Sequence, residues 1–115
     1  TANDILIGTG VGHRPIAHIY NNKYSFVHAW WPFLHTFRGG VDVAAGDLDG
    51  DGVDEIITSP GEGMEPLIKV FDSRGRQLYD QFRAYSSLTK PGIDVIVADV
   101  DFDGRDDIIG MSEGI

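Results

Sequence analysis

The sequence repeats itself, and this repeat limits the possible folds more than any other feature. Residues 40–57 (GVDVAAGDLDGDGVDEII) align with residues 92–109 (GIDVIVADVDFDGRDDII) at an offset of 52. Residues 2–21 align in turn with residues 53–72 at an offset of 51. In repeat proteins each period is one supersecondary unit, and a period of roughly 50 residues is the size of a β-propeller blade.

Each repeat reads as four short β-strands separated by turns. β-branched and aromatic residues form short runs, and the 15 glycines stand mostly singly between them. Such runs predict strands, and the Gly-, Asp- and Asn-rich segments between them predict tight turns. We therefore expect an all-β fold of β-propeller blades, each of four antiparallel strands. The expected first strands are 41–47 and 93–99, the second 4–8, 55–59 and 107–111, the third 15–21 and 66–72, and the fourth 26–33 and 78–85.

About two blades fit into residues 1–115, which we expect to be one repeat region. Residues 1–39 are expected to form a partial blade lacking its first strand, and residues 40–91 a complete blade. Residues 92–115 then supply the first two strands of a further blade. Propellers typically close with about four to eight blades. We therefore expect the propeller to be completed by further repeats or by oligomerisation, with self-association through blade edges.

Composition favours a cation as a partner. The formal net charge is −9, which argues against nucleic acid and anionic membranes, since both attract Lys and Arg. Apolar runs are far shorter than the roughly 18 residues needed to cross a bilayer, so no membrane insertion is expected. Cysteine is absent, which excludes disulfides and thiolate metal sites. A small extracellular chain without disulfides needs another stabilising device, such as a metal or an oligomer interface.

Two loops concentrate the acidic charge. Five carboxylates lie between positions 47 and 55, and five more between positions 99 and 107, so the two loops hold ten of the chain's 18 acidic residues. At a separation of ~5 Å and an effective dielectric constant near 20, each like-charge pair costs about 3 kcal/mol. Either the carboxylates cap a metal-free hairpin turn in solvent, or a divalent cation turns the repulsion into attraction.

The spacing of the carboxylates supports a metal. Side chains at loop positions 1, 3 and 5 converge when the backbone curls, a glycine at position 6 permits the turn, and position 7 offers its carbonyl. An EF-hand would also need Glu at position 12 and flanking helices, whereas Thr58 and Gly110 stand there between strand-like runs. Hard oxygen ligands at this number favour Ca²⁺ over Mg²⁺, which would need fewer protein ligands and more water. The ligands predicted in this way are Asp47, Asp49, Asp51 and the Val53 carbonyl in the first loop, and Asp99, Asp101, Asp103 and the Arg105 carbonyl in the second.

These residues together resemble the FG-GAP repeat, which is the integrin-α-type β-propeller blade, and the similar VCBS-like repeats. The shared pattern is D-x-D-x-D-G-x-x-[D/E] before a β run, with G-V-D-V-A ahead of it and P-x-[I/V]-x-V-[F/Y]-[D/N] behind it. The resemblance implies a last ligand at position 9, namely Glu55 or Asp107, although the family prefers Asp or Asn where Glu55 stands. Strand alternation predicts that Asp54 and Asp106, at position 8, point away from the ion.

The resemblance also implies a function. We expect a calcium-stabilised extracellular β-propeller repeat module, secreted or on the cell surface, with a structural, adhesive or assembly role. The resemblance implies protein or polysaccharide ligands. The alternative is an ancillary propeller domain of an extracellular carbohydrate-active enzyme. For catalysis by the chain itself the sequence offers no residue set: cysteine is absent, no serine lies in a nucleophile-elbow motif, and no catalytic residue is expected.

The histidines, one glycine-rich segment and the tryptophans are expected to have packing, turn or interface roles. The four histidines, at positions 13, 18, 28 and 35, lack the tight spacing of metal ligands and are expected in packing or surface roles. The segment GTGVG, residues 8–12, is expected to be a turn because no helix follows that could hold a phosphate. Trp30 and Phe33 have aromatic counterparts in the next repeat and are expected in blade packing. Trp31 has none, which makes it the better interface candidate.

Overall fold

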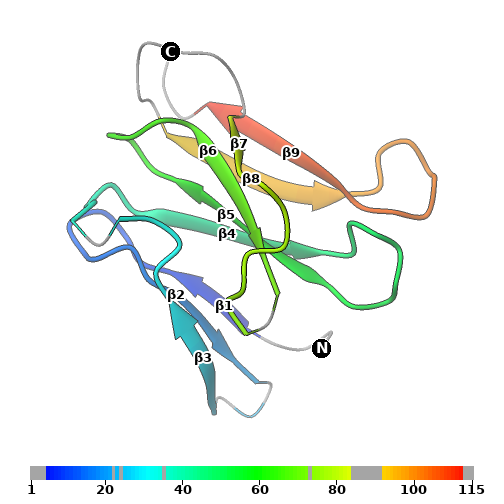
Figure 1. Ribbon diagram of the computed structural model, residues 1–115, viewed down its shortest axis with the longest axis horizontal. Helices are drawn as coiled ribbons and strands as arrows, with labels where there is room; N and C mark the ends of the chain where they lie inside the picture. The colour runs from blue at the N-terminus through cyan, green and yellow to red at the C-terminus, as the bar shows by residue number, and fades with distance from the viewer. Residues whose placement is uncertain are drawn as a thin grey trace.

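The computed structural model describes residues 5–21, 23, 25–34, 36–72, 74–83 and 92–112, and within them the fold is all-β, without a helix. The strands lie in three antiparallel sheets of three, four and two strands (Figure 1). The strands are β1 (Ile5–Gly8), β2 (Ala17–Tyr20), β3 (Phe26–Trp30), β4 (Val41–Gly46), β5 (Glu55–Pro60), β6 (Leu67–Phe71), β7 (Phe82–Arg83), β8 (Ile93–Ala98) and β9 (Asp107–Ser112).

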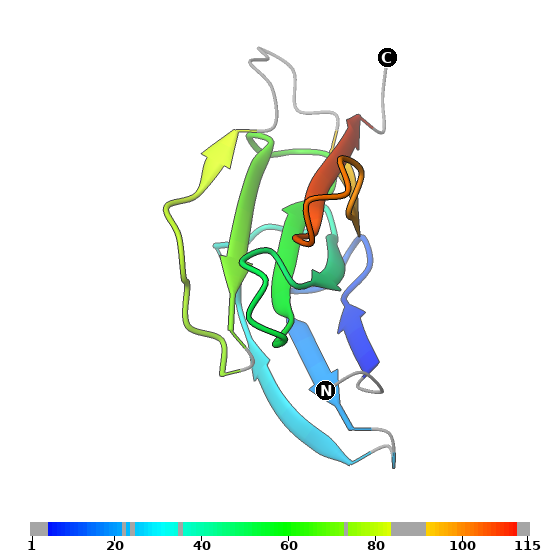
Figure 2. The same ribbon diagram turned by 90° about the vertical axis from the view of Figure 1, so that its right-hand side faces the viewer.

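Each sheet follows chain order, so within a sheet every strand pairs with the next strand in the sequence. The orders are β1-β2-β3, β4-β5-β6-β7 and β8-β9. Figure 1 shows the sheets as a fan, with the middle sheet between the N-terminal sheet and the β8–β9 hairpin, and Figure 2 shows the same arrangement from the side. Contacts between the sheets run through β4, which touches both β1 and β8. This repetition of one up-and-down unit confirms the predicted all-β, antiparallel fold.

The core lies between the middle sheet and the C-terminal hairpin. Every residue of β5 is buried, which fits a strand covered on both faces. In β8 the burial alternates, with Ile93 and Val95 buried and their neighbours exposed, as expected for a strand covered on one face. The buried cluster consists of Ile57, Ile68, Val70, Ile93 and Val95. The middle sheet and the hairpin are thereby joined by apolar side chains from both.

Two polar side chains of the middle sheet hold the backbone of β8. Asp42 Oδ2 accepts the Val95 N–H at 2.8 Å, and Ser59 Oγ donates to the Ile93 carbonyl at 2.9 Å. Asp42 and Ser59 lie opposite each other in the β4–β5 register, so they project from the same face. Among the described residues, β8 pairs only with β9, and these two side chains supply partners to two further main-chain groups of β8.

Glycines stand where the sheets approach most closely. A Cβ at Gly8 of β1 would lie 2.2 Å from the Val41 carbonyl oxygen, and a Cβ at Gly46 of β4 would lie 2.1 Å from Val97 Cγ1. Both distances are shorter than any real contact of a Cβ atom. A side chain at either position would therefore push neighbouring sheets apart.

The predicted fourth strands are too long. Strand β3 ends at Trp30, and β7 covers only Phe82–Arg83 of the predicted range 78–85. Pro32 has no N–H to continue the first ladder. In the range 78–85, the strand before β7 is interrupted. Gln77 forms only an isolated β-bridge with Phe71, and its side-chain amide donates to the Tyr79 carbonyl. The end of that predicted strand, including Tyr85, lies outside the described residues.

Candidate metal centres

Both acidic loops lie at the same end of the molecule. Residues 47–54 connect β4 to β5, and residues 99–106 connect β8 to β9. In Figure 1 the two loops project side by side at the right-hand edge, and in Figure 2 they face the viewer. Each loop is the hairpin turn between the first two strands of its sheet, which is the position that the repeat predicts.

The first loop gathers four carboxylates. Asp47, Asp49, Asp51 and Glu55 each offer an oxygen, and these oxygens lie within 4.8 Å of one another. Asp47 organises the turn because its carboxylate accepts backbone N–H groups from residues 50, 51 and 52 at 2.8–3.1 Å. Gly52, at loop position 6, has a φ of +85°, a conformation that favours glycine. The predicted convergence of positions 1, 3, 5 and 9 is therefore present in the first loop.

The carboxylates of the first loop differ in their surroundings. Glu55 is 3% exposed, and its Oε1 accepts the Leu48 N–H at 2.9 Å. Burial raises the pKa of the Glu55 carboxyl, and the neighbouring aspartate charges raise it further. Burial also raises the pKa of Asp49. By contrast, the N–H of Gly52 lowers the pKa of Asp47. The site thus contains acids that are costly to ionise without a positive partner.

The second loop gathers three carboxylates. Oxygens of Asp99, Asp101 and Asp107 lie within 4.8 Å of one another. Asp107 Oδ2 accepts the Val100 N–H at 3.1 Å, which repeats the bond between position 9 and position 2 of the first loop. Burial and then the Asp103 charge raise the pKa of Asp101.

Asp103, the predicted ligand at position 5, is not among these three. Its Oδ1 accepts the Arg105 N–H at 2.9 Å, and this bond lowers the pKa of Asp103. The guanidinium of Arg105 lowers it further. The carboxylate therefore already has a partner in its own turn.

The predicted carbonyl ligands at position 7 lie in the same turns. The Val53 N–H donates to Asp51 Oδ1, just as the Arg105 N–H donates to Asp103. A Cβ at Gly50 would lie 3.4 Å from Arg105 Cγ, so the Arg105 side chain runs beside the first loop. The second loop thus brings a cationic side chain next to the acids of the first.

Asp106 does not join the acidic group of its own loop, as strand alternation predicts, but it has a role that the prediction did not include. Its Oδ2 accepts the Asp47 N–H at 2.9 Å, and its own N–H donates to the Asp47 carbonyl at 2.8 Å. The side chain points away from its own loop but into the neighbouring one, which strand alternation alone could not reveal. Its counterpart Asp54 is exposed. Asp106 therefore ties the two acidic loops together.

The donor set fits a hard divalent cation. All the converging groups are carboxylate oxygens, and such oxygens are the ligands that calcium prefers. Two such ions would change the formal charge from −9 to −5, because each adds two positive charges. The residues that would hold them are Asp47, Asp49, Asp51 and Glu55 in the first loop and Asp99, Asp101 and Asp107 in the second.

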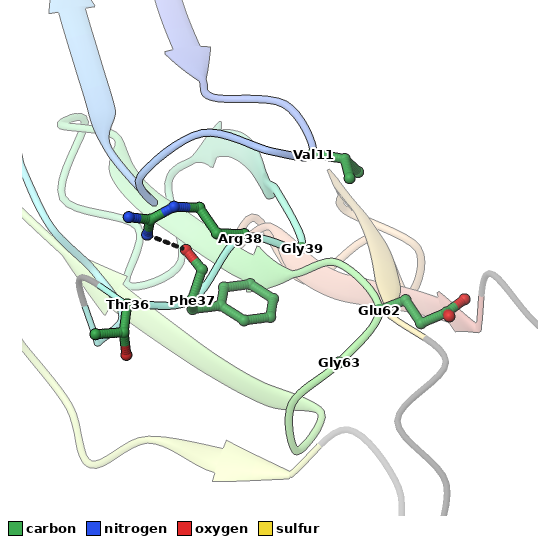
Figure 3. Close-up of a pocket in the computed structure, with 7 residues that line it drawn as sticks. All are labelled: Val11, Thr36, Phe37, Arg38, Gly39, Glu62 and Gly63. Atoms are coloured by element: carbon green, nitrogen blue, oxygen red, sulfur yellow. Dashed lines mark hydrogen bonds between the residues drawn. The ribbon is translucent and has the colours of Figure 1, made fainter.

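A cavity lies at the opposite end of the sheets. Its volume is about 640 Å³, and it is lined by Val11, Thr36, Phe37, Arg38, Gly39, Glu62 and Gly63. Figure 3 shows the Phe37 ring at its centre, with Arg38 and Glu62 extending in opposite directions. Arg38 donates to the Phe37 carbonyl at 3.1 Å. No sequence motif predicts this cavity, because its lining comes from three separate connections.

The remaining predicted residues have packing or turn roles where they are described. His18 stacks on Tyr20 and His28 stacks on Trp30. Within the described ranges no histidine belongs to a group that could hold a metal, and His35 lies outside those ranges. Trp31 is 47% exposed, with the Arg14 guanidinium 5.8 Å from its ring centre. Gly8 ends β1, and residues 9–12 lie in the β1–β2 connection, where the turn was predicted.

The fold and the loops define a class: a repeat protein of antiparallel β-sheets with acidic turns between the first and second strands. Residues 39–76 match the family model of the FG-GAP repeat, which confirms the resemblance and is consistent with an FG-GAP-type repeat protein. No significant match to a curated protein or to a solved structure was found. The described residues include no helix long and apolar enough to span a membrane.

Proposed function

We propose that the chain is a calcium-stabilised, extracellular β-propeller repeat module with a structural, adhesive or assembly role and no catalysis of its own. The observation that supports this best is the repeated convergence of acidic oxygens within 4.8 Å in two successive hairpin turns. In each turn the ion would tie the first strand to the second. The described sheets would then be blades, completed by further repeats or by other copies of the chain.

An extracellular setting, secreted or at the cell surface, follows from the same chemistry. Extracellular calcium modules typically bind with dissociation constants of roughly 10⁻⁴–10⁻³ M, so they are filled only where calcium is abundant. The absence of cysteine leaves such a module without disulfides, and bound ions would take over their stabilising role.

Thermal unfolding with and without calcium tests the proposal. At a free calcium concentration of about ten times Kd, each site adds about 1.4 kcal/mol of stability. At roughly 4 °C per kcal/mol, two sites should raise the melting temperature by about 10 °C. EDTA should reverse the shift, and Mg²⁺ at equal concentration should give a smaller one. The double variant D49N/D51N should lose about half of the shift.

Asp80 provides the control, because it is exposed and lies outside both loops. D80N should respond to calcium as the unaltered chain does. A melting curve that is the same in calcium and in EDTA would contradict the proposal.

A further inference from the structure

Asp106 of the second acidic loop holds Asp47 of the first at two points. The Asp106 N–H donates to the Asp47 carbonyl at 2.8 Å, and Asp106 Oδ2 accepts the Asp47 N–H at 2.9 Å. Asp47 is position 1 of the first loop, and its carboxylate is one of the four that converge there. The main chain of a candidate ligand is therefore fixed by the neighbouring repeat.

The peptide group between Arg105 and Asp106 serves both candidate sites. Its N–H is the donor to Asp47, and its carbonyl is the predicted position-7 ligand of the second loop. A peptide group is planar and stiff, so its carbonyl and its N–H cannot be oriented independently. A cation that fixed the Arg105 carbonyl would therefore also fix the donor to Asp47.

The connection continues into the first site. The peptide group between Asp47 and Leu48 accepts the Asp106 N–H through its carbonyl, and its own N–H donates to Glu55 Oε1 at 2.9 Å. Glu55 is the position-9 carboxylate of the first loop. Hydrogen bonds in such a chain polarise one another. Two peptide groups in series thus connect a predicted ligand of the second ion to a carboxylate of the first site.

Close packing keeps this connection in place. A Cβ at Gly46 would lie 3.0 Å from Asp106 Oδ2, so the glycine lets the carboxylate reach the main chain of the first loop. Arg105 adds a second contact, because a Cβ at Gly50 would lie 3.4 Å from Arg105 Cγ. Asp106 itself belongs to neither group of converging carboxylates. Its place in the structure is that of a residue that positions ligands of the first site.

We propose that Asp106 is a positioning residue that couples the two cation sites, so that an ion in the second loop tightens binding in the first. An ion held by the Arg105 carbonyl and Asp107 orders the segment that carries Asp106. Asp106 then holds Asp47 in place before the first site is filled, so less conformational entropy is lost when its ion binds. Repulsion between the ions opposes this effect, but salt at about 0.15 M screens exposed charges beyond about 8 Å.

This inference rests on the proposed calcium binding, and titration calorimetry of the full chain with calcium at about 0.15 M salt tests it. The variant D99N/D101N removes the second site, and D49N/D51N removes the first. Each loop has five carboxylates, so a filled loop and a loop with two of them neutralised both carry a charge of −3. The variants therefore imitate the charge of a filled site without its ordering effect.

Coupling makes the product of the two association constants of the unaltered chain exceed the product of the constants of the two single-site variants. We expect a factor of at least about five, and linkage requires the same factor whichever ion binds first. Comparison of these products does not depend on any change at Asp106.

Replacement of Asp106 then tests the route of the coupling. D106A leaves the Asp47 N–H without its acceptor, so the factor should fall close to one. D106N removes the same charge but keeps an oxygen that can accept this N–H, so it should restore most of the factor. Neither change should alter the affinity of the second site measured in the D49N/D51N background. D54A is the matched control, because Asp54 stands at the same position of the first loop and is exposed.

Equal products for the unaltered chain and the single-site variants would overturn the inference while leaving calcium binding intact. A factor that persists in D106A, or that D54A removes equally, would reject Asp106 as the coupling residue. A chain that takes up no calcium would instead contradict the proposed function, and the inference would fall with it.

Discussion

The Glu55 side chain should destabilise the fold without a bound cation and stabilise it with one. It is buried, it accepts the Leu48 N–H, and its burial raises the pKa of its carboxyl. Without a cation, folding confines this charge beside three aspartates. With a cation, the same charge becomes an attraction. Substitution of Glu55 should therefore change stability in opposite directions under the two conditions.

We expect E55Q to raise the melting temperature in EDTA at pH 7 by roughly 2–5 °C, because the neutral amide removes repulsion of about 1 kcal/mol. The Gln oxygen can still accept the Leu48 N–H. In calcium the order should reverse, with E55Q melting below the unaltered chain. Calorimetry under both conditions checks this. If E55Q lowered the melting temperature equally in EDTA and in calcium, Glu55 would be a structural residue only.

The ionisation of Asp72, which lies outside both acidic loops, should make the stability of the chain depend on pH. Burial tends to raise the pKa of Asp72, but N–H groups of Arg76 and Arg74 and the Arg76 guanidinium outweigh it, so the pKa is lowered. A lowered carboxyl pKa stabilises the fold above the unfolded value of about 3.9, and this stability is lost as pH falls through the folded pKa.

The variant D72A isolates this effect. Urea unfolding at pH 7 should show D72A less stable than the unaltered chain by about 1 kcal/mol, since it loses hydrogen bonds within an exposed turn. Below pH 3.5 the difference should shrink. A difference that stayed constant from pH 7 to acid would mean that ionisation of Asp72 contributes nothing.

At the scale of elements, sheets are joined by side chains that bond to main-chain atoms. Asp42 accepts the Val95 N–H, and Ser59 donates to the Ile93 carbonyl. Val95 is 4% exposed, so its N–H has little access to water if the carboxylate is removed. An unsatisfied buried N–H costs about 1–3 kcal/mol.

D42A should therefore lower the free energy of unfolding by about 1–3 kcal/mol in urea titrations. The matched control is D94A, since Asp94 occupies the same position one repeat later and is exposed. At concentrations where the chain is monomeric, D94A should change stability by less than about 0.5 kcal/mol. Equal losses in the two variants would show that the bond to Val95 does not hold the hairpin.

Sequence reasoning predicted the acidic turns and the pairing of first with second strands, because their partners lie within one repeat. It made the fourth strands too long, since it could not locate where each ladder ends. It gave no information on contacts between repeats. Asp106 bonds to a loop 59 residues earlier, and strand alternation carries no information about that contact.

At the scale of the molecule, the two ends of the sheets carry different features. The acidic turns occupy one end, and the cavity beside Phe37 occupies the other (Figures 1 and 3). The strands that join them carry the buried cluster. The cavity and the acidic turns have no residue in common, so we expect substitutions in the cavity lining to leave the convergence of the acids unchanged.

The hydrogen bonds of Asp42 and Ser59 to β8 restrict the sequence of β8 very little. Asp42 bonds to a main-chain N–H, and Ser59 bonds to a main-chain carbonyl oxygen. Every residue except proline supplies both groups. These two bonds therefore tolerate most substitutions in the docked strand, and the demand on side-chain identity falls on its buried residues Ile93 and Val95. After a gene duplication, the exposed positions of such a strand can diverge freely while the bonds to its main chain are kept.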